Sequence, residues 1–340
     1  MTELLKHHTT FRVGGPARRF VEATTEQQLI DLVADCDARD EPVLVLGGGS
    51  NVLISDDGFD GTVVKVATRG VAVEQEACFG AQVQAAAGEN WDDLVAQASA
   101  EEWSGLETLS GIPGSVGATP VQNVGAYGFE VADVIQQVRT WDRRDQAVRT
   151  FAAADCDFAY RTSRFKRERG RYLVLRVDFQ LPLGDQSQPV RYPELARELG
   201  VEVGQRAPAV QVRQTVLAIR RRKGMVLDET DHDTWSAGSF FTNPILTADQ
   251  AARLPEGAPR FQAEGGTKTS AAWLIQHAGL NPGYGPGPAT LSTRHVLALT
   301  NRGTAAASDL VALAREVRAR VADRFGIILV PEVNLVGVEF

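Results

Sequence analysis

The sequence predicts an α+β protein, and three observations support this prediction. The apolar run Val43–Leu46 ends at three glycines, which is typical of a buried strand that enters a tight turn. Apolar residues recur at helical spacing over 25–36, 90–103 and again near the C-terminus. Strict alternation over Tyr172–Leu181 predicts a half-buried strand in an antiparallel sheet.

Size and composition narrow the possible functions. A chain of 340 residues favours two or three domains, and 44% hydrophobic with 23% charged residues is typical of a globular protein. No apolar run approaches the roughly 18 residues that cross a bilayer, and the N-terminus lacks a signal-peptide pattern, so we expect a cytoplasmic protein with no membrane partner. The net charge of -8 argues against a nucleic-acid partner but allows a small phosphorylated ligand.

The first helices carry their own start signals. Thr25 and Gln28 have the spacing of a capping box, and Asn90 is placed to cap a helix that has Asp92 and Asp93 in its first turn. A further strand is expected at Thr62–Val66.

The second half of the chain alternates connections and helices. Polar stretches at 184–189 and 204–208 are candidate boundaries, and 282–288 is rich in proline and glycine and is expected to be loop. A helix that contains Val212 and Val216 is expected to run into the basic cluster 220–223, which is either a solvated helix end or a phosphate-binding group. The last amphipathic helix is expected to start near Ser308.

Two glycine-rich segments are the strongest functional signals. Gly47–Asn51 follows a strand directly, and its glycines permit close backbone approach to an anion. Its spacing is not Gly-x-Gly-x-x-Gly, which argues against a standard dinucleotide-binding turn. Gly111–Gly117 and Gln122–Gly128 together concentrate glycines with Ser, Gln and Asn, and this mixture favours a diphosphate and a heterocycle held by backbone groups. Each segment could also be a plain structural turn.

Three other residues are weaker signals of function when each is taken alone. Arg161 could be a surface arginine, and Ser239 could be a turn serine at the start of a strand. Glu332 stands in an otherwise apolar run, where a carboxylate is expensive to bury unless it is paired or functional. No nucleophile elbow, Walker loop or metal-binding histidine spacing is present, so we expect metal-free chemistry. The cysteines Cys36, Cys78 and Cys156 are expected to be free, buried thiols.

The motifs, in this order and spacing, resemble the UDP-N-acetylenolpyruvoylglucosamine reductase family of bacterial peptidoglycan synthesis. The resemblance runs almost end to end. It covers His8–Phe11, Gly47–Asn51, Gly105–Glu107, Gly111–Gly117, Gln122–Gly128, Tyr160–Ser163, Gly238–Pro244, Ala272–Ile275 and Pro331–Val333.

The resemblance implies an FAD-binding fold of the vanillyl-alcohol-oxidase type, built from two α+β subdomains, together with a C-terminal α+β substrate domain. The first subdomain would cover residues 1–67 with a return over 326–340, the second 68–205, and the substrate domain 206–325. It also implies non-covalently bound FAD, NADPH as co-substrate and a UDP-sugar enolpyruvyl ether as substrate. The protein would act as a monomer.

The resemblance assigns roles residue by residue. Ser239 matches the proton donor, and Arg161 and Glu332 match the residues that complete the active site. Tyr192, Lys223 and Asn243 match substrate-binding residues, with Tyr192 on the tyrosine loop of the longer family type. The implied cofactor-binding residues are Gly47, Gly48, Gly49, Ser50, Asn51, Gly111, Ile112, Gly114, Ser115, Gly117, Gln122, Asn123, Gly125, Ala126 and Tyr127.

The sequence departs from the longer type in two places. Extra residues separate Lys223 from Ser239, which leaves the role of Lys223 open, and no tyrosine stands near Phe261. The implied reaction is hydride addition to the substrate C3, charge stabilisation by Arg161 and Glu332, and protonation of C2 by Ser239.

Two other functions compete with this interpretation. An FAD-dependent oxidase of the same fold often carries a histidine or cysteine linked to the flavin, and neither glycine-rich segment contains one. A non-catalytic nucleotide-binding module would not need Arg161, Ser239 and Glu332 together.

Overall fold

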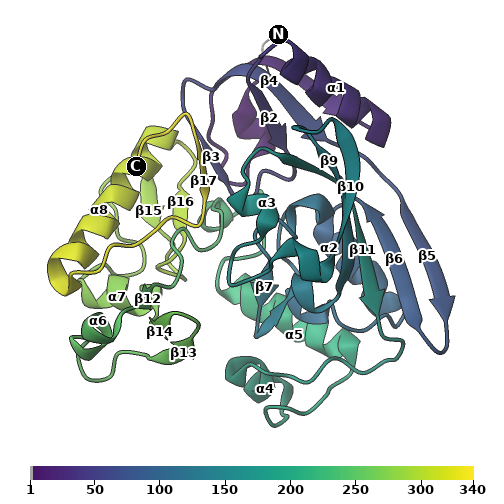
Figure 1. The fold of residues 1–340 in the computed structure, drawn as a ribbon. Coiled ribbons are helices and arrows are strands. Elements are labelled where there is room, and N and C mark those ends of the chain that lie inside the picture. The colour runs from purple at the N-terminus through teal and green to yellow at the C-terminus, as the bar shows by residue number, and fades with distance from the viewer. Residues whose placement is uncertain (1–2) are drawn as a thin grey trace. The chain divides into compact units, whose positions relative to one another are not determined.

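The computed structural model describes residues 3–340, which form two compact units. One unit contains the chain up to Ala17, Gly49–Phe59 and Arg222–Phe340, and the other contains Arg18–Gly48 and Asp60–Arg221. Both units mix helices with small sheets, so the predicted α+β class is confirmed (Figure 1). Within residues 3–340, no helix has the length and apolar character needed to span a membrane.

Two sheets organise the unit that contains Asp60–Arg221. A three-stranded sheet has the order β1 (Ala17–Ala23), β4 (Phe59–Val66), β2 (Val43–Leu46), and β2 runs parallel to β4. A five-stranded antiparallel sheet has the order β10 (Ala147–Ala152), β9 (Ile135–Asp142), β11 (Tyr172–Leu181), β6 (Gly80–Ala86), β5 (Val71–Glu76).

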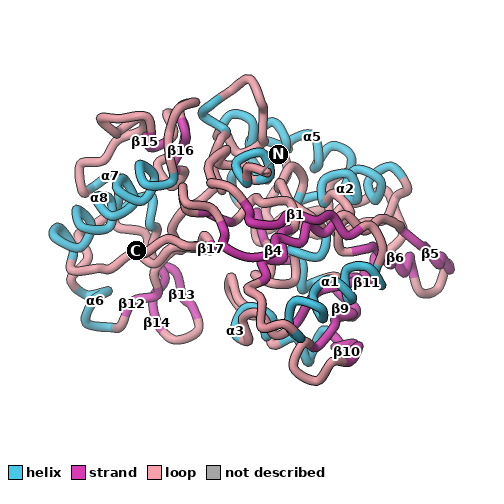
Figure 2. The backbone as a smooth tube through the Cα atoms, turned by 90° about the horizontal axis from the view of Figure 1, so that it is seen from above, coloured by secondary structure: helices cyan, strands magenta, loops and turns pink. Residues whose placement is uncertain are grey.

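Helix α1 (Glu26–Ala38) lies beside β9, and Figure 2 shows them next to each other. Arg139 of β9 binds Glu26 at 2.9 Å, and Arg143 forms a second ion pair with Asp37. Thr25 accepts a hydrogen bond from the Gln28 amide as predicted, although the Gln28 side chain accepts from the Thr24 amide instead of completing the box.

The remaining helices of this unit are α2 (Trp91–Ala100), α3 (Arg164–Arg167), α4 (Pro193–Leu199) and α5 (Ala209–Arg222). Asn90 caps α2 as predicted, but the helix stops before Trp103 because Glu102 adopts φ 56° and Trp103 pairs with Leu183. The prediction that β11 is half-buried was wrong for its second face. Val174 and Asp178 are buried there because β11 lies at the centre of the sheet, between β9 and β6.

The other unit is built around α8 (Ala307–Phe325), which packs along the hairpin of β15 (Ala289–Leu291) and β16 (Leu299–Asn301) (Figure 1). Leu310, Leu313, Val317 and Val321 of α8 are buried, as its predicted apolar face requires. A second small sheet has the order β12 (Ile245–Leu246), β14 (Gly266–Lys268), β13 (Phe261–Ala263), with α6 (Ala248–Ala252) and α7 (Ala271–His277) nearby.

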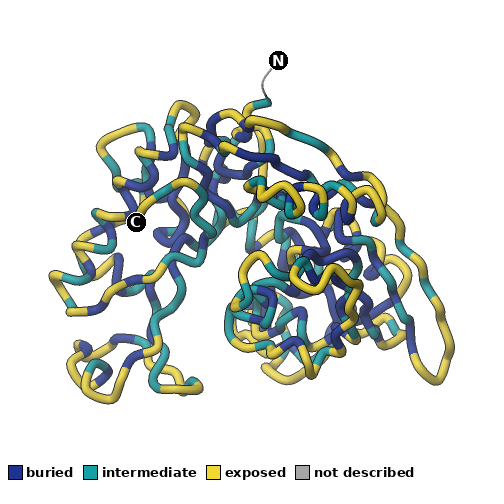
Figure 3. Tube along the Cα trace, turned by 45° about the horizontal axis from the view of Figure 1, so that its top comes forward, coloured by how far each residue is buried: buried dark blue, intermediate teal, exposed yellow. Residues whose placement is uncertain are grey.

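The C-terminal strand β17 (Asn334–Val336) pairs in parallel with β3 (Val52–Ile54), so the end of the chain returns to the segment that follows the first glycines. Strand β11 and the connection 103–111 are largely buried, whereas the tip of the β5–β6 hairpin is exposed (Figure 3). The cysteine prediction was wrong for Cys78. All three thiols are free, but Cys78 is exposed because it lies in the tip of the β5–β6 hairpin, beside Phe79 at 73% exposure.

Candidate active site

The two glycine-rich segments contact one another. A Cβ atom added at Gly48 would lie 2.6 Å from the Cα of Gly114, and one added at Gly47 would lie 2.6 Å from the Ser115 hydroxyl oxygen. Glycine is therefore needed at Gly48 for the two backbones to approach so closely, whereas at Gly47 the neighbouring atom belongs to a side chain that can rotate. The Lys65 ammonium donates to the carbonyl of Gly47, and burial lowers the pKa of this lysine.

Helix α2 holds the second glycine-rich segment at several points. The Trp91 amide donates to the Gly114 carbonyl at 3.1 Å, and the Trp91 indole donates to the Leu109 carbonyl at 3.1 Å. The Asp92 carboxylate accepts from the Gly111 amide at 2.6 Å. This network fixes the loop that the sequence assigned to the cofactor.

Arg213 of α5 forms an ion pair with Asp92. Arg213 donates to both Asp92 oxygens at 2.6 and 3.0 Å. Burial alone would raise the pKa of Asp92, but the Arg213 guanidinium and the Gly111 amide outweigh burial and hold this pKa below its usual value. Sequence reasoning missed this pair because its members lie 121 positions apart and no local pattern connects them.

The stretch Gln122–Tyr127 is held in place by residues that lie outside it. Asn123, at φ 47° and 1% exposure, donates its side-chain amide to Glu130 at 2.6 Å and to the Ala159 carbonyl at 3.2 Å. Its side-chain oxygen accepts from the Ala132 amide at 3.2 Å. The side chain of Asn123 therefore faces the protein interior, and its predicted contact with the cofactor depends on its backbone or on its effect on the loop.

Arg161 lies in a tight turn that packs against this stretch. Ala159 and Thr162 exchange two backbone hydrogen bonds of 3.1 Å, and Arg161 between them has φ 54°. The guanidinium donates to the carbonyls of Gly125 at 2.7 Å and Asn123 at 3.4 Å. A non-glycine residue in the left-handed region is uncommon and is often found where a side chain has to be aimed. Arg161 is therefore not a solvated surface arginine.

Ser239 and Glu332 lie on paired backbone segments of the other unit. The Glu332 amide donates to the Phe240 carbonyl at 2.8 Å, and the Thr242 amide donates to the Val330 carbonyl at 3.0 Å. This short antiparallel ladder places Glu332 opposite the residue that follows Ser239. Both side chains are half-exposed, whereas Phe240 between them on the ladder is buried.

The end of the first glycine-rich segment joins this ladder. Asn51 donates its side-chain amide to the Glu332 carbonyl at 3.2 Å, and its own carbonyl accepts from the Asn334 amide at 3.1 Å. Gly49, with φ 64°, packs so tightly that an added Cβ would lie 1.8 Å from the His8 carbonyl oxygen. The structure thus brings Asn51, Ser239 and Glu332 together within one unit, and it brings Arg161 together with Gly125 in the other.

The predicted substrate residues have different surroundings. Tyr192 immediately precedes α4, and its ring meets the edge of the Tyr127 ring at a centroid distance of 5.6 Å. Asn243 accepts a hydrogen bond from the Ala271 amide at the start of α7 at 2.9 Å, so its side-chain oxygen has a structural role. Lys223 directly follows α5 and is half-buried, as is Arg220, whose pKa is lowered by burial. The basic cluster is therefore not simply a solvated helix end.

A cavity of about 370 Å³ lies at the edge of the three-stranded sheet. Thr24, Thr68 and Arg69 line it from the ends of β1 and β4, and Leu175 and Arg176 line it from β11. Because β2 and β4 are parallel, Thr68 and Gly47 both follow the carboxyl ends of their strands, where ligands bind in open sheets of this kind. Sequence reasoning did not anticipate this cavity.

Comparison with known proteins decides the family. The chain is 61% identical over 333 residues to the UDP-N-acetylenolpyruvoylglucosamine reductase of Cutibacterium acnes, covering 97% of this chain and 88% of that protein. It is 54% identical over 342 residues to the enzyme of the same name from Streptomyces coelicolor, covering 97% and 88%. The crystal structure of UDP-N-acetylenolpyruvylglucosamine reductase (MurB) from Thermus caldophilus superposes with a TM-score of 0.68 at 26% identity and covers 99% of this chain and 98% of that one.

The chain belongs to the UDP-N-acetylenolpyruvoylglucosamine reductase family. Residues 229–336 match the model of the family's C-terminal domain, and residues 17–150 match the model of an FAD-binding domain. The predicted family, the FAD-binding fold and the FAD cofactor are thereby confirmed. The match favours the reductase over the oxidase and over a non-catalytic module.

The residues that are present fit FAD. Residues 17–150 contain both glycine-rich segments, and the contact between Gly48 and Gly114 leaves no room for a side chain, so the two backbones approach as closely as a phosphate-binding loop requires. The roles of individual residues within this site stay predictions.

Proposed function

We propose that this protein reduces the enolpyruvyl group of UDP-N-acetylglucosamine enolpyruvate with NADPH to give UDP-N-acetylmuramate. The observation that carries the proposal is the backbone ladder that joins Ser239, Glu332 and Asn51, because it links a proton donor and an acid directly to the end of a cofactor loop. In this role the enzyme serves peptidoglycan precursor synthesis, and through it cell-wall formation, cell shape and division. It acts in the cytoplasm as a monomer.

The cofactor is held by the glycine-rich segments. Backbone groups of 47–51, 111–117 and 122–127 would hold the phosphates and the flavin ring of FAD, and the cavity beside Thr68 and Leu175 would take its adenosine end. When bound, FAD would supply the redox chemistry of the reaction, which is the transfer of a hydride from NADPH to C3 of the enolpyruvyl group. Asp92 and Arg213 keep the second segment in place.

Charge that develops on the substrate carboxylate needs donors that are already oriented. Arg161 meets this requirement because the Gly125 carbonyl holds its guanidinium at 2.7 Å, so little reorganisation is needed when the charge appears. Glu332, in its protonated form, donates a hydrogen bond to the same group. The two residues lower the energy of the enolate-like species without forming a covalent bond to it.

Ser239 completes the reaction by giving its hydroxyl proton to C2, so that one hydride and one proton are added across the double bond. A serine hydroxyl is a weak acid, and it transfers its proton only to a strongly basic carbon held at hydrogen-bond distance. Tyr192, Lys223 and Asn243 bind the UDP-sugar, and Tyr192 belongs to the tyrosine loop of the longer family type. Its packing on Tyr127 supports a place beside the cofactor.

The division into residues 1–67 with 326–340, 68–205 and 206–325 belongs to the same proposal. The parallel pairing of β17 with β3 supports the C-terminal return.

The two half-reactions test the proposal separately. The purified protein should show a flavin spectrum that NADPH bleaches and that the enolpyruvyl substrate restores. Ser239→Ala should be reduced by NADPH as the wild type is, and should be reoxidised far more slowly. If both half-reactions slowed equally, Ser239 would not be the proton donor, and a wild type that substrate cannot reoxidise would refute the function itself.

A further inference from the structure

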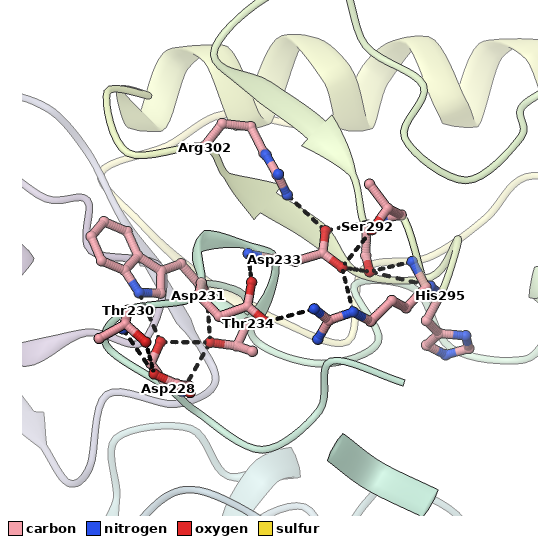
Figure 4. A network of polar contacts seen from close by, with 11 residues as sticks. Asp228, Thr230, Asp231, Asp233, Thr234, Ser292, His295 and Arg302 are labelled. Atoms are coloured by element: carbon pink, nitrogen blue, oxygen red, sulfur yellow. Dashed lines mark hydrogen bonds and ion pairs between the residues drawn. The ribbon is translucent and has the colours of Figure 1, made fainter. Parts of the chain in front are cut away.

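A buried carboxylate, Asp233, lies six residues before Ser239, and the reaction proposed above assigns it no role. It is 3% exposed and sits in a short 3-10 helix, His232–Thr234. It accepts hydrogen bonds from the Ser292 hydroxyl at 2.9 Å, the Thr293 amide at 2.9 Å and the Thr293 hydroxyl at 3.1 Å. Figure 4 shows this cluster of polar contacts.

Two arginines complete the cluster. Arg302 donates to one Asp233 oxygen at 2.7 Å, and Arg294 approaches the other at 3.7 Å while it pairs with Asp231 at 2.7 Å. The Asp233 carboxylate is therefore surrounded by donors from the hairpin connection after β15 and from the residue after β16. A buried carboxylate that accepts hydrogen bonds from this many donors holds its neighbours in one arrangement.

The same hairpin connection also holds the other end of the segment that carries Ser239. The Phe240 amide donates to the Leu297 carbonyl at 2.8 Å, and the Trp235 carbonyl accepts from the Asn301 amide at 3.1 Å. Only residues 236–239 lie between these anchors. Within them, Gly238 has φ 69° and no atom within 4 Å of the place where a Cβ would stand.

Residues that precede the 3-10 helix also hold it in place. The Thr234 hydroxyl donates to the Asp228 carbonyl at 2.9 Å and accepts from the Asp228 amide at 2.9 Å (Figure 4). The Asp231 side chain accepts from the Asp233 amide at 3.0 Å. Movement of Asp233 would be passed to the four-residue span that ends in Ser239 through Thr234, whose carbonyl accepts a hydrogen bond from the Ser236 amide at 2.9 Å.

We propose that Asp233 is a positioning residue that sets the place of the Ser239 hydroxyl for proton transfer. The inference rests on the proposed function, because it assumes that Ser239 protonates the substrate. Asp233 touches neither substrate nor cofactor in this role. It acts through the span 236–239, whose two ends are held on the same hairpin by the Asn301 amide and the Leu297 carbonyl.

The test is Asp233→Asn, which keeps the size of the side chain and removes its charge. NADPH should reduce the flavin of this variant at the wild-type rate. Reoxidation by the enolpyruvyl substrate should slow by up to about 10²-fold, the effect of a displacement near 1 Å on a reacting group. The solvent deuterium isotope effect on reoxidation should rise, because proton transfer becomes the slow step. A merely structural carboxylate would not change that isotope effect.

Asp56→Asn is the matched control. Asp56 lies in the same unit and accepts from the amides of Ala307 and Ser308 at 2.6 and 3.0 Å, so its loss also removes carboxylate hydrogen bonds, but far along the chain from the Ser239 span. It should leave both half-reactions and the isotope effect unchanged. Equal slowing in the two variants would overturn the proposal, as would a wild-type isotope effect in Asp233→Asn.

Arg302→Gln provides a second variant in case Asp233→Asn does not fold. The Arg302 side chain is 36% exposed and supplies one donor to Asp233. The variant should therefore show the same slowing of reoxidation and the same rise in the isotope effect, both smaller than in Asp233→Asn. An unchanged reoxidation step in this variant would count against the proposal. A wild type that is reduced by NADPH but not reoxidised by the substrate would overturn the proposed function and this inference with it. Normal wild-type turnover with unaffected variants would overturn the inference alone.

Discussion

Substitution of Gly48 tests the contact between the two glycine-rich segments. A Cβ atom at Gly48 would lie 2.6 Å from the Cα of Gly114 and 2.9 Å from its carbonyl carbon, about 0.8 Å short of an ordinary contact at 3.4 Å. The atoms it would meet belong to the backbone, so no side chain can rotate away. Gly48→Ala must therefore push the two segments apart.

The magnitude follows from that displacement. Overpacking at a well-packed site costs about 1–3 kcal/mol. If this cost falls on the cofactor site, the dissociation constant of FAD rises by about 5- to 150-fold. Gly47→Ala should have a smaller effect, because the atom met at 2.6 Å is the Ser115 hydroxyl, which can rotate. Gly287→Ala is the control, since no atom lies within 4 Å of its added Cβ.

The assay is titration of the flavin-free protein with FAD, followed by the quenching of flavin fluorescence. The ratio of flavin to protein absorbance in the purified variants gives an independent measure. The expected order of affinity is wild type and Gly287→Ala together, then Gly47→Ala, then Gly48→Ala. If Gly48→Ala bound FAD as the wild type does, or if Gly47→Ala were the weaker of the two, the close approach of the segments would not determine cofactor binding.

Three further outcomes are expected. Arg161→Lys should lose the fork of donors held by Gly125 and slow reoxidation by about 10²- to 10³-fold at unchanged flavin content, measured by stopped-flow absorbance; wild-type reoxidation would refute the role of Arg161. Burial tends to raise the pKa of Asp233, but the donors around it outweigh burial and lower this pKa. The stabilising contribution of Asp233 is therefore present above the unfolded-state pKa of about 3.9 and is lost as pH falls through the folded-state pKa. Asp233→Asn should accordingly cost about 3 kcal/mol in urea unfolding at neutral pH, with the difference closing in acid; a gap that did not close would contradict this account. A thiol reagent should label Cys78 alone in the native protein, because Cys156 is buried with its pKa raised to about 12, and mass spectrometry of the labelled peptides would show any exception.

Local signals in the sequence predicted much of the fold correctly. Thr25 and Asn90 cap their helices because a cap needs only a side chain and amides three residues away. The alternation over Tyr172–Leu181 predicted β11 with its bounds, since a period of two residues is a property of the strand itself. The burial of Val174 and Asp178 was not predicted, because it depends on what the rest of the chain places against that face.

The same distinction holds for the candidate site. The glycines at 47–49 and 111–117 were visible as positions where backbones approach closely, but nothing in the sequence says that Gly48 approaches Gly114. The interior direction of the Asn123 side chain was likewise hidden, since its partners Glu130 and Ala159 reach it only in the folded loop.

The residues that orient the candidate site residues were the hardest to predict from the sequence. Asp92 meets Arg213 across 121 positions, and Asp233 meets Ser292 across 59. The roles proposed for Arg161, Ser239 and Glu332 rest on the family resemblance of the short motifs that contain them, and such motifs can be recognised in the sequence because their spacing is local. Which groups orient them could be learned only from the tertiary structure, because hydrogen bonds between distant segments leave no period or spacing along the chain.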